Sequence, residues 1–477
     1  MKQPSAFLLT LLSGLAAGVG MLVAPLWFCA PLGLGVWIAT LWERTHSRKQ
    51  ALLLGALFGT VTSGAGILSL LEIIPPTESP SLLPTLLATF LLWIIPTVAL
   101  GITSAPVGIA LYLTRRNLFA PLIAVALWVL NEELRMWAWM LITYGTGAIP
   151  EPHLSIAALG YALADNAYLL QLAEGGGLLF LTIATAVFAA TIASAVQDGA
   201  RLRLTFMVLA TLVLLCIPLT QQPLQFGGET VRIALVATQT DPLAPSVFSS
   251  PKLSGPAPDV LILPEGKSLE AVLPQELLSR TASGSWLSAS NDLLVIRSGE
   301  SVDPTGKRHN TVFYESAAEG VLATQNKHFI MPQGEYMPHL SKLFLSWLPD
   351  SALMRIPDEK AIVHGETLIS VPFQGVTFGT LLCSELFSPH LYRKLSEHYD
   401  ATVLVSLADP IWFQSSPILF RKTVQVAKVH AVQNRAYFLA AQNATPSFVI
   451  DPTGSLVAQS AWYQNDVLFF DLPKQLP

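Results

Sequence analysis

The pattern of apolar and polar positions divides the chain into two unlike parts. Up to about residue 220, long apolar runs alternate with short polar connections. A helix needs about 20 mainly apolar residues to cross the hydrocarbon core of a bilayer. Seven runs have this character, although the second is short and the fourth is interrupted by prolines: Ser5–Ala24, Leu26–Trp42, Ala51–Ile74, Thr85–Leu113, Leu118–Ile142, Tyr168–Ala195 and Leu204–Leu219. We therefore expect residues 1–220 to form a transmembrane helical domain of about seven spans.

The basic residues indicate how this domain is oriented. Lysine and arginine lie in alternate connections between the apolar runs, at Lys2, Arg44, Arg48, Lys49, Arg115, Arg116, Arg201 and Arg203. Connections rich in these residues stay in the cytoplasm. Seven spans with a cytoplasmic N-terminus place the chain after residue 231 on the outer side. The first run lacks a convincing signal-peptide cleavage site, so we expect it to be retained as a span.

After a linker at residues 221–230, the pattern changes to short runs typical of β-strands, separated by turn residues. The expected strands are Val231–Gln239, Asp259–Glu265, Asp292–Arg297, Asn310–Glu315, Val376–Cys383, Thr402–Leu407, Tyr437–Gln442 and Val467–Leu472. Helical patterns such as Phe420–Val432 lie between some of them. Residues 231–477 are numerous enough for one α/β domain with its own core.

Composition and charge narrow the possible functions. Of the 477 residues, 52% are hydrophobic and 12% are charged, and the mean hydropathy is +0.52. Soluble domains carry about 25% charged residues, so a plain soluble enzyme is excluded. The formal net charge of −5 has the wrong sign for a nucleic-acid-binding protein. Three cysteines cannot form a disulfide framework or a thiolate metal site, and the histidines of the C-terminal part show no paired ligand spacing, so we expect no metal and no cofactor.

Three strand ends in the C-terminal part deliver polar residues out of apolar runs, at Glu265, Lys327 and Cys383. Each residue alone has an ordinary structural interpretation: the carboxylate as a cap or ion-pair partner, the lysine as a solvated side chain, and the cysteine as a small core residue. As a set they suggest chemistry, because a thiol with its ordinary pKa near 8.5 needs a partner before it becomes a nucleophile at neutral pH.

In this order, Glu265, Lys327 and Cys383 resemble the catalytic triad of the nitrilase superfamily. With the apolar half in front of it, the chain resembles the apolipoprotein N-acyltransferase family, bacterial membrane enzymes that complete the acylation of lipoproteins. Further segments that look like family features are Gly55–Gly59, Trp128–Arg135, Leu170–Glu174 and, most specifically, Lys327 followed by Pro332-Gln-Gly-Glu-Tyr336. The resemblance implies a nitrilase-like αββα sandwich for residues 231–477 and a location in the bacterial inner membrane.

The resemblance also implies a two-step acyl transfer. Glu265 would be the general base for Cys383, whose thiolate would take an acyl chain from a phospholipid as a thioester. Lys327, together with backbone N–H groups near Ser384, would stabilise the oxyanion. The acyl group would then pass to the N-terminal amine of a diacylglyceryl-cysteine in a lipoprotein.

Supporting roles follow from the same resemblance. Glu335 matches a second family carboxylate, which would orient Lys327 and hold its charge, and Glu385 also matches a family position. Aromatic residues near these motifs, at Tyr336, Trp347, Trp412 and Phe413, are candidates for loops that contact lipid or substrate. The apolar stretches that hold them are equally consistent with ordinary core elements.

The sequence departs from the family at several positions. Ser384 stands where a tyrosine usually follows the nucleophile, Leu407 and Gln414 replace the usual serine and glycine, and Gln333 replaces a phenylalanine. No closing apolar span follows Leu472. These departures leave two alternatives open. The first is a membrane-tethered nitrilase-like amidase or acyltransferase with another acceptor, as in conjugal-transfer proteins, and the second is a catalytically silent membrane scaffold.

Overall fold

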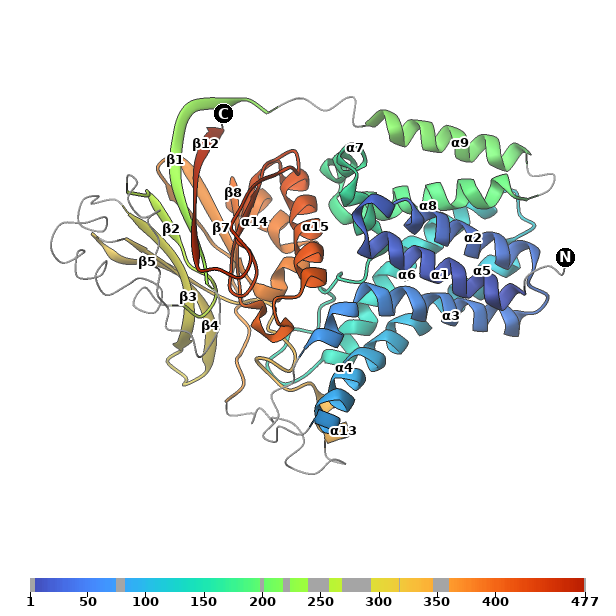
Figure 1. Ribbon diagram of the computed structural model, residues 1–477, viewed down its shortest axis with the longest axis horizontal. Coiled ribbons are helices and arrows are strands. Elements are labelled where there is room, and N and C mark those ends of the chain that lie inside the picture. The colour runs from blue at the N-terminus through green and yellow to red at the C-terminus, as the bar shows by residue number, and fades with distance from the viewer. Residues whose placement is uncertain are drawn as a thin grey trace. The chain divides into compact units, whose positions relative to one another are not determined.

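The computed structural model describes residues 5–73, 82–197, 201–217, 224–238, 257–267, 293–316, 318–345 and 360–475. These residues form two compact units. The first holds the described residues of Met1–Thr143 and Pro150–Gln222 and is helical (Figure 1). The second holds those of Tyr144–Ile149, Pro223–Asp350 and Met354–Pro477 and is built on β-sheets.

The helical unit consists of helices that lie side by side (Figure 1). They are α1 (Ala6–Leu22), α2 (Cys29–Glu43), α3 (Arg48–Gly66), α4 (Leu82–Ile102), α5 (Ser104–Thr114), α6 (Ala120–Thr143), α7 (Ala167–Leu170), α8 (Gly177–Ala195) and α9 (Arg201–Cys216). Three segments are long and apolar enough to cross a membrane: Ala24–Glu43, Leu86–Thr114 and Gly177–Ala195. The number of seven spans remains a prediction.

The fourth apolar run is interrupted, as its prolines predict. Helix α4 ends at Ile102 and α5 begins at Ser104, with Pro96 inside α4. Proline lacks an N–H group and its ring clashes with the preceding turn, so a long helix bends or breaks near it. One apolar run therefore becomes two helical segments.

Close helix packing explains the Gly55–Gly59 segment of α3. A Cβ atom on Gly55 would lie 2.4 Å from the Ser104 carbonyl oxygen, and one on Gly59 would lie 2.3 Å from the Gly101 carbonyl oxygen. Small residues four positions apart let helix backbones approach closely. The two glycines therefore seat α3 directly against the junction of α4 and α5.

Charged residues of α6 are sorted between the inside and the outside of the helical unit. Arg135 donates to Glu132 at 3.1 Å and to the Ser63 hydroxyl at 2.7 Å, and both charged side chains are buried. An ion pair in an apolar helical bundle is stable only when its members satisfy one another. Glu133, by contrast, is exposed on the same helix.

The second unit contains two six-stranded sheets (Figure 1). The first sheet has the order β12 (Asp466–Gln475), β1 (Phe226–Ala237), β2 (Val260–Ile262), β3 (Leu294–Val302), β4 (Arg308–Ser316) and β5 (Gly320–Asn326). The second has the order β11 (Leu456–Gln459), β10 (Phe448–Ile450), β9 (Tyr437–Gln442), β8 (Val403–Ala408), β7 (Val376–Leu382) and β6 (Ser370–Phe373). In each sheet the central strands run parallel and the outer pairs run antiparallel.

A single apolar core lies between the two sheets. Ile233, Ile262 and Ile296 of the first sheet pack in one buried cluster with Phe378 and Val405 of the second. Alternate residues of a strand point to opposite faces, so each sheet buries one face in this core. Helices α14 (Leu391–Tyr399) and α15 (Pro417–Asn434) pack on the second sheet. The second sheet and its helices match one half of the expected αββα sandwich.

A short segment that precedes the β-strands by many residues belongs to the second unit. Tyr144–Ile149 follows α6, and its backbone pairs with the chain around Pro338 through Gly145. The His339 N–H donates to the Tyr144 carbonyl at 2.9 Å, and His364 donates from Nδ1 to the Gly147 carbonyl at 2.7 Å. The loop after α6 therefore completes the fold of the β unit.

Candidate active site

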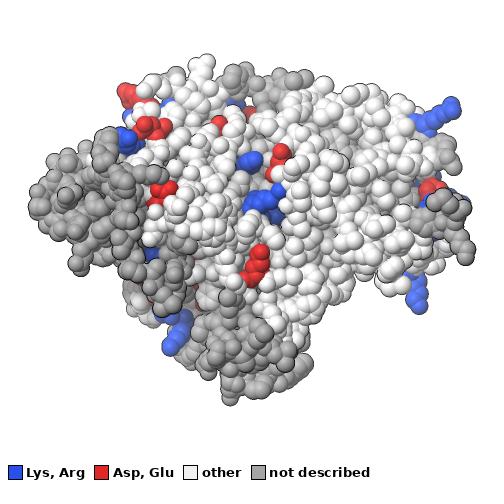
Figure 2. Space-filling model, viewed as in Figure 1, with Lys and Arg blue, Asp and Glu red and all other residues white. Residues whose placement is uncertain are grey.

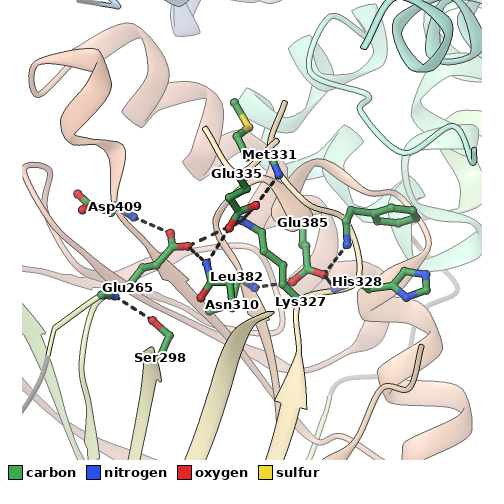
Figure 3. Close-up of polar contacts among 12 residues, drawn as sticks. Glu265, Ser298, Asn310, Lys327, His328, Met331, Glu335, Leu382, Glu385 and Asp409 are labelled. Carbon is green, nitrogen blue, oxygen red and sulfur yellow. Dashed lines mark hydrogen bonds and ion pairs between the residues drawn. The ribbon is translucent and has the colours of Figure 1, made fainter. Parts of the chain in front are cut away.

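Glu265 lies in a turn just after β2, and both sides of the turn are fixed. The Asn443 side chain donates from Nδ2 to the Glu265 carbonyl oxygen at 2.9 Å. The Ser298 hydroxyl accepts a hydrogen bond from the Gly266 N–H at 2.9 Å (Figure 3). Asn443 is fully buried. The backbone that carries Glu265 is therefore held by neighbours from both sheets.

Lys327 follows β5 and is almost completely buried, with an exposed fraction of 1%. Its Nζ atom lies 3.0 Å from Oε2 of Glu335 and 3.8 Å from Oε1 of Glu265. Glu335 is itself fixed, because the Met331 N–H donates to its Oε2 at 2.5 Å (Figure 3). The lysine charge therefore lies between two carboxylates that come from separate loops.

Asn310 joins these two carboxylates and was not among the residues predicted from the sequence. Its Nδ2 group donates to Oε1 of Glu265 at 2.8 Å and to Oε1 of Glu335 at 2.7 Å (Figure 3). Asn310 lies on β4, the strand next to β5. Its direct neighbours, His309 and Thr311, are also polar, so no local pattern in the sequence marks Asn310.

Cys383 begins η8 (Cys383–Phe387), directly after β7. Its backbone has φ of 48°, in the left-handed region that few non-glycine residues adopt. Such conformations are concentrated at functional sites. The Cys383 thiol donates a hydrogen bond to Glu265, and the charge of Lys327 also acts on the thiol. The structure thus brings Glu265, Lys327 and Cys383 together.

Glu385, two residues after Cys383, is fully buried and fixes the turn at the nucleophile. Its Oε1 accepts backbone N–H groups of His328 at 2.7 Å and Phe329 at 3.1 Å, and its Oε2 accepts the Leu382 N–H at 2.7 Å (Figure 3). These donors lie on either side of the site: two follow Lys327 and one precedes Cys383. Glu385 therefore ties the lysine loop to the cysteine turn.

Burial and charge shift the protonation of these groups. Burial raises the pKa of Glu265, the Lys327 charge and the Asn310 hydrogen bond oppose that rise, and Glu335 adds to it. Burial also raises the pKa of the Cys383 thiol well above its ordinary value, and the Lys327 charge opposes this shift. The Cys383 thiol is therefore protonated at rest, next to a carboxylate that has become a stronger base.

Burial and charge also have opposite effects on the pKa values of Lys327 and Glu385. Burial alone would lower the pKa of Lys327, but Glu335 and Glu265 outweigh burial and raise it. Burial raises the pKa of Glu385 to about 7, although Lys327 and the three N–H donors favour its charged form. Lys327 therefore remains an ammonium ion and can stabilise negative charge that develops on a reacting oxygen.

The remaining predicted residues lie in different environments. Ser384 is buried, and its hydroxyl has no hydrogen-bond partner among the described residues. Tyr336 is 2% exposed and packs in a cluster with Ile330 and Ile362, so it is not an exposed lipid-facing ring. In η9 (Pro410–Phe413), Trp412 is 42% exposed and Phe413 is half-buried. Trp347 lies outside the described residues.

The η9 segment is connected to the site through its preceding residue. The Asp409 N–H donates to Oε2 of Glu265 at 3.2 Å (Figure 3). The next residues, Ile411 and Trp412, expose apolar side chains. Among the described residues, no group of three or more His, Cys, Asp or Glu side chains could hold a metal ion.

The sequence profile of the carbon-nitrogen hydrolase family matches residues 284–476, which include Lys327, Cys383 and most of the two sheets. The profile of the apolipoprotein N-acyltransferase N-terminal domain matches residues 13–191. The chain belongs to the apolipoprotein N-acyltransferase family.

Named relatives show how far the similarity extends. An apolipoprotein N-acyltransferase from Aquifex aeolicus (strain VF5) is 25% identical over 214 residues, which are 45% of this chain and 45% of that protein. One from Nitrosomonas europaea is 26% identical over 442 residues, 88% of this chain and 82% of that protein. The match thus spans about half of the first relative and most of the second. A solved CN-hydrolase superfamily protein from Xanthomonas campestris aligns with 51% of this chain and 91% of its own, at 16% identity and a TM-score of 0.36.

Proposed function

We propose that this protein is an apolipoprotein N-acyltransferase, which moves an acyl chain from a phospholipid to the N-terminal amine of a diacylglyceryl-cysteine in a lipoprotein. The observation that carries the proposal is the buried contact of Glu265 with both Lys327 and Cys383, in a chain that also carries apolar helices. The family profiles of both halves support it.

In the first half-reaction, Glu265 accepts the proton of the Cys383 thiol. The thiolate then attacks the carbonyl carbon of the acyl ester, and Lys327 donates to the oxyanion that forms, together with backbone N–H groups near Ser384. The C–O ester bond breaks, and the leaving alkoxide takes the proton from Glu265. The products are a thioester on Cys383 and a lysophospholipid.

In the second half-reaction, the lipoprotein amine attacks the thioester carbonyl carbon. Glu265 accepts a proton from the amine, and Lys327 again stabilises the oxyanion. The C–S bond breaks, and the thiolate recovers its proton from Glu265. The amide product is released, and Glu265 and Cys383 return to their starting protonation states. Glu335 and Glu385 position Lys327 and the cysteine turn, and neither reacts.

The same proposal includes the placement in the membrane. We expect seven spans in the inner membrane, a helical domain of residues 1–220 and a catalytic domain of residues 231–477 on the outer side. The loop after α6 supports this orientation: it contains no lysine or arginine, and its residues Tyr144–Ile149 fold into the catalytic unit. A segment that folds into a domain must lie on the same side of the membrane as that domain. The exposed Ile411 and Trp412 fit a domain that takes lipid from the bilayer surface.

Complementation tests the whole proposal. A bacterium depleted of its own apolipoprotein N-acyltransferase should grow when it makes this protein, and mass spectrometry should show triacylated lipoprotein N-termini. Cys383→Ala should abolish both effects, whereas Cys29→Ala and Cys216→Ala, which change the other two cysteines, should not.

The outcome also separates the alternatives. A Cys383 thioester that forms from phospholipid but acylates only another amine, or releases free fatty acid, would contradict the lipoprotein acceptor. A protein that folds in phospholipid and never forms an acyl-enzyme would instead support the scaffold alternative.

A further inference from the structure

A polar cavity lies at one end of the helical unit, and all of its lining residues belong to that unit. Its volume is about 510 Å³, and it is lined where α2 and α5 end and α9 begins. Three arginines line it, Arg115, Arg116 and Arg203, together with a single carboxylate, Glu43. The lining therefore carries a net positive charge, which favours an anion.

Two of the arginines are held in place by backbone carbonyls and by neighbouring side chains. Arg203 donates to the Arg115 carbonyl at 3.0 Å and to Oε1 of Gln197, another lining residue, at 2.6 Å. The Arg115 guanidinium lies 3.9 Å from the centre of the Tyr112 ring and donates to the Thr45 carbonyl at 3.4 Å. The positive charge is thus organised before any ligand binds.

One of the lining arginines has donors that are not used within the protein. Arg116 is exposed and makes no hydrogen bond or ion pair with any described part of the chain. Its guanidinium can bind a phosphate through two N–H groups.

The rim of the cavity distinguishes a lipid from a free anion. Leu118 and Leu202 line the same cavity and are 44% and 55% exposed. Figure 2 shows Lys and Arg side chains at this end of the helical unit, on the right of the view, and a mainly uncharged flank beside it. A phosphate group bound by the arginines would leave its acyl chains along these leucines. Inorganic phosphate has no acyl chain and would gain no binding free energy from these leucines.

We propose that this cavity binds the phosphate headgroup of an anionic glycerophospholipid. The basic loops at this end are those that the charge pattern predicts to be cytoplasmic, and the inner leaflet is rich in anionic lipid. Arg116 contacts the phosphate oxygens, Arg203 and Arg115 supply fixed charge, and the leucines contact the chains. No residue of this cavity takes part in the proposed acyl transfer, so the two proposals stand separately.

Native mass spectrometry of the delipidated full chain tests the proposal, with phosphatidylglycerol and phosphatidylcholine of the same acyl chains as probes. Phosphatidylglycerol should bind about tenfold more tightly than phosphatidylcholine. Arg116→Gln should weaken the binding of phosphatidylglycerol about fivefold, the usual contribution of one basic residue near anionic lipid.

Arg48→Gln is the matched control. Arg48 is exposed at the start of α3, on the same side of the bundle, and does not line the cavity. Equal binding of the two lipids, or an equal loss in Arg48→Gln and Arg116→Gln, would overturn the proposal. Competition by inorganic phosphate or glycerophosphoglycerol at millimolar concentration, as effective as the lipid itself, would assign the cavity to a free phosphate instead. Since Arg116 has no contact that supports the fold, its variant should remain folded.

Discussion

Glu265 and Glu335 both lie within 4 Å of the Lys327 ammonium, yet only Glu265 hydrogen-bonds to the Cys383 thiol. Their roles should therefore separate on substitution. Glu265→Gln keeps the size of the side chain but cannot accept a proton, so acyl-enzyme formation should fall by about 10²-fold or more. Glu335→Gln leaves Cys383 able to react and loosens Lys327, so it should reduce the rate less.

A phospholipid donor without any acceptor isolates this comparison, because only the first half-reaction can then occur. The acyl-enzyme, read by intact-protein mass spectrometry, should appear slowly for Glu335→Gln and hardly at all for Glu265→Gln. The reverse order would assign the proton transfer to Glu335 and contradict the role proposed for Glu265.

Asn310 should act on the site through the carboxylate that it holds. Its hydrogen bond lowers the pKa of Glu265 against the effect of burial. In Asn310→Ala this hydrogen bond is absent, so the pKa of Glu265 rises and the carboxylate is protonated at a higher pH. The acid limb of the pH–rate profile for acyl-enzyme formation should move to higher pH. A uniform loss of rate with an unmoved limb would indicate a purely structural role.

At the scale of elements, Glu385 connects the chain after β5 to the turn after β7 through three backbone N–H groups. A glutamine has one acceptor oxygen, so Glu385→Gln leaves at least one buried N–H without a partner. The loss should be about 1–3 kcal/mol of unfolding free energy. Thermal unfolding of the purified protein should begin at a lower temperature.

A surface glutamate provides the comparison for this variant. Glu397→Gln removes a half-exposed partner of Arg393, and such ion pairs contribute about 0.3–0.5 kcal/mol. It should leave the unfolding temperature nearly unchanged. Equal shifts in Glu385→Gln and Glu397→Gln would contradict the bridging role of Glu385.

The sequence predicts elements best where burial makes the pattern strong. Strand β9 has the predicted bounds, Tyr437–Gln442, because five of its six residues are buried between other strands. Strand β5 was not predicted, because it lies at the edge of its sheet and most of its residues are exposed or half-exposed. Its apolar run is short, at residues 321–323, and polar residues follow it.

The candidate site shows the same limit. Glu265, Lys327 and Cys383 were predicted from motifs that each lie within a few residues. Asn310 and Asn443 depend on partners that are 45 and 178 residues away in sequence, and no local pattern marks such contacts. The fold alone places these two amides beside Glu265.

For the molecule as a whole, His430 predicts how stability depends on pH. It lies on α15, is 1% exposed, and donates from Nε2 to the Leu386 carbonyl of η8 at 2.8 Å. Burial lowers its pKa to about 4. Between about pH 6.5 and pH 4 the unfolded chain therefore binds a proton that the folded protein does not, so stability falls as the pH falls, by about 3 kcal/mol at most.

Unfolding measured across this pH range should therefore show a smaller acid dependence in His430→Gln than in the unchanged protein. His398→Gln changes an exposed histidine on α14 and should retain the full dependence. If the acid dependence of stability decreases equally in His430→Gln and His398→Gln, it does not arise from His430.

The position of Tyr144–Ile149 has a consequence for how the protein is made. A chain emerges from the ribosome N-terminus first, so this segment appears before any strand of the unit in which it folds. The hydrogen bonds from His339 to the Tyr144 carbonyl and from His364 to the Gly147 carbonyl can form only after those histidines have been synthesised. If the protein is produced as two fragments divided in the linker, the second fragment lacks a segment that only the first carries. Mixing the two fragments should restore the fold of the β unit, whereas a first fragment from which Tyr144–Ile149 has been deleted should not restore it.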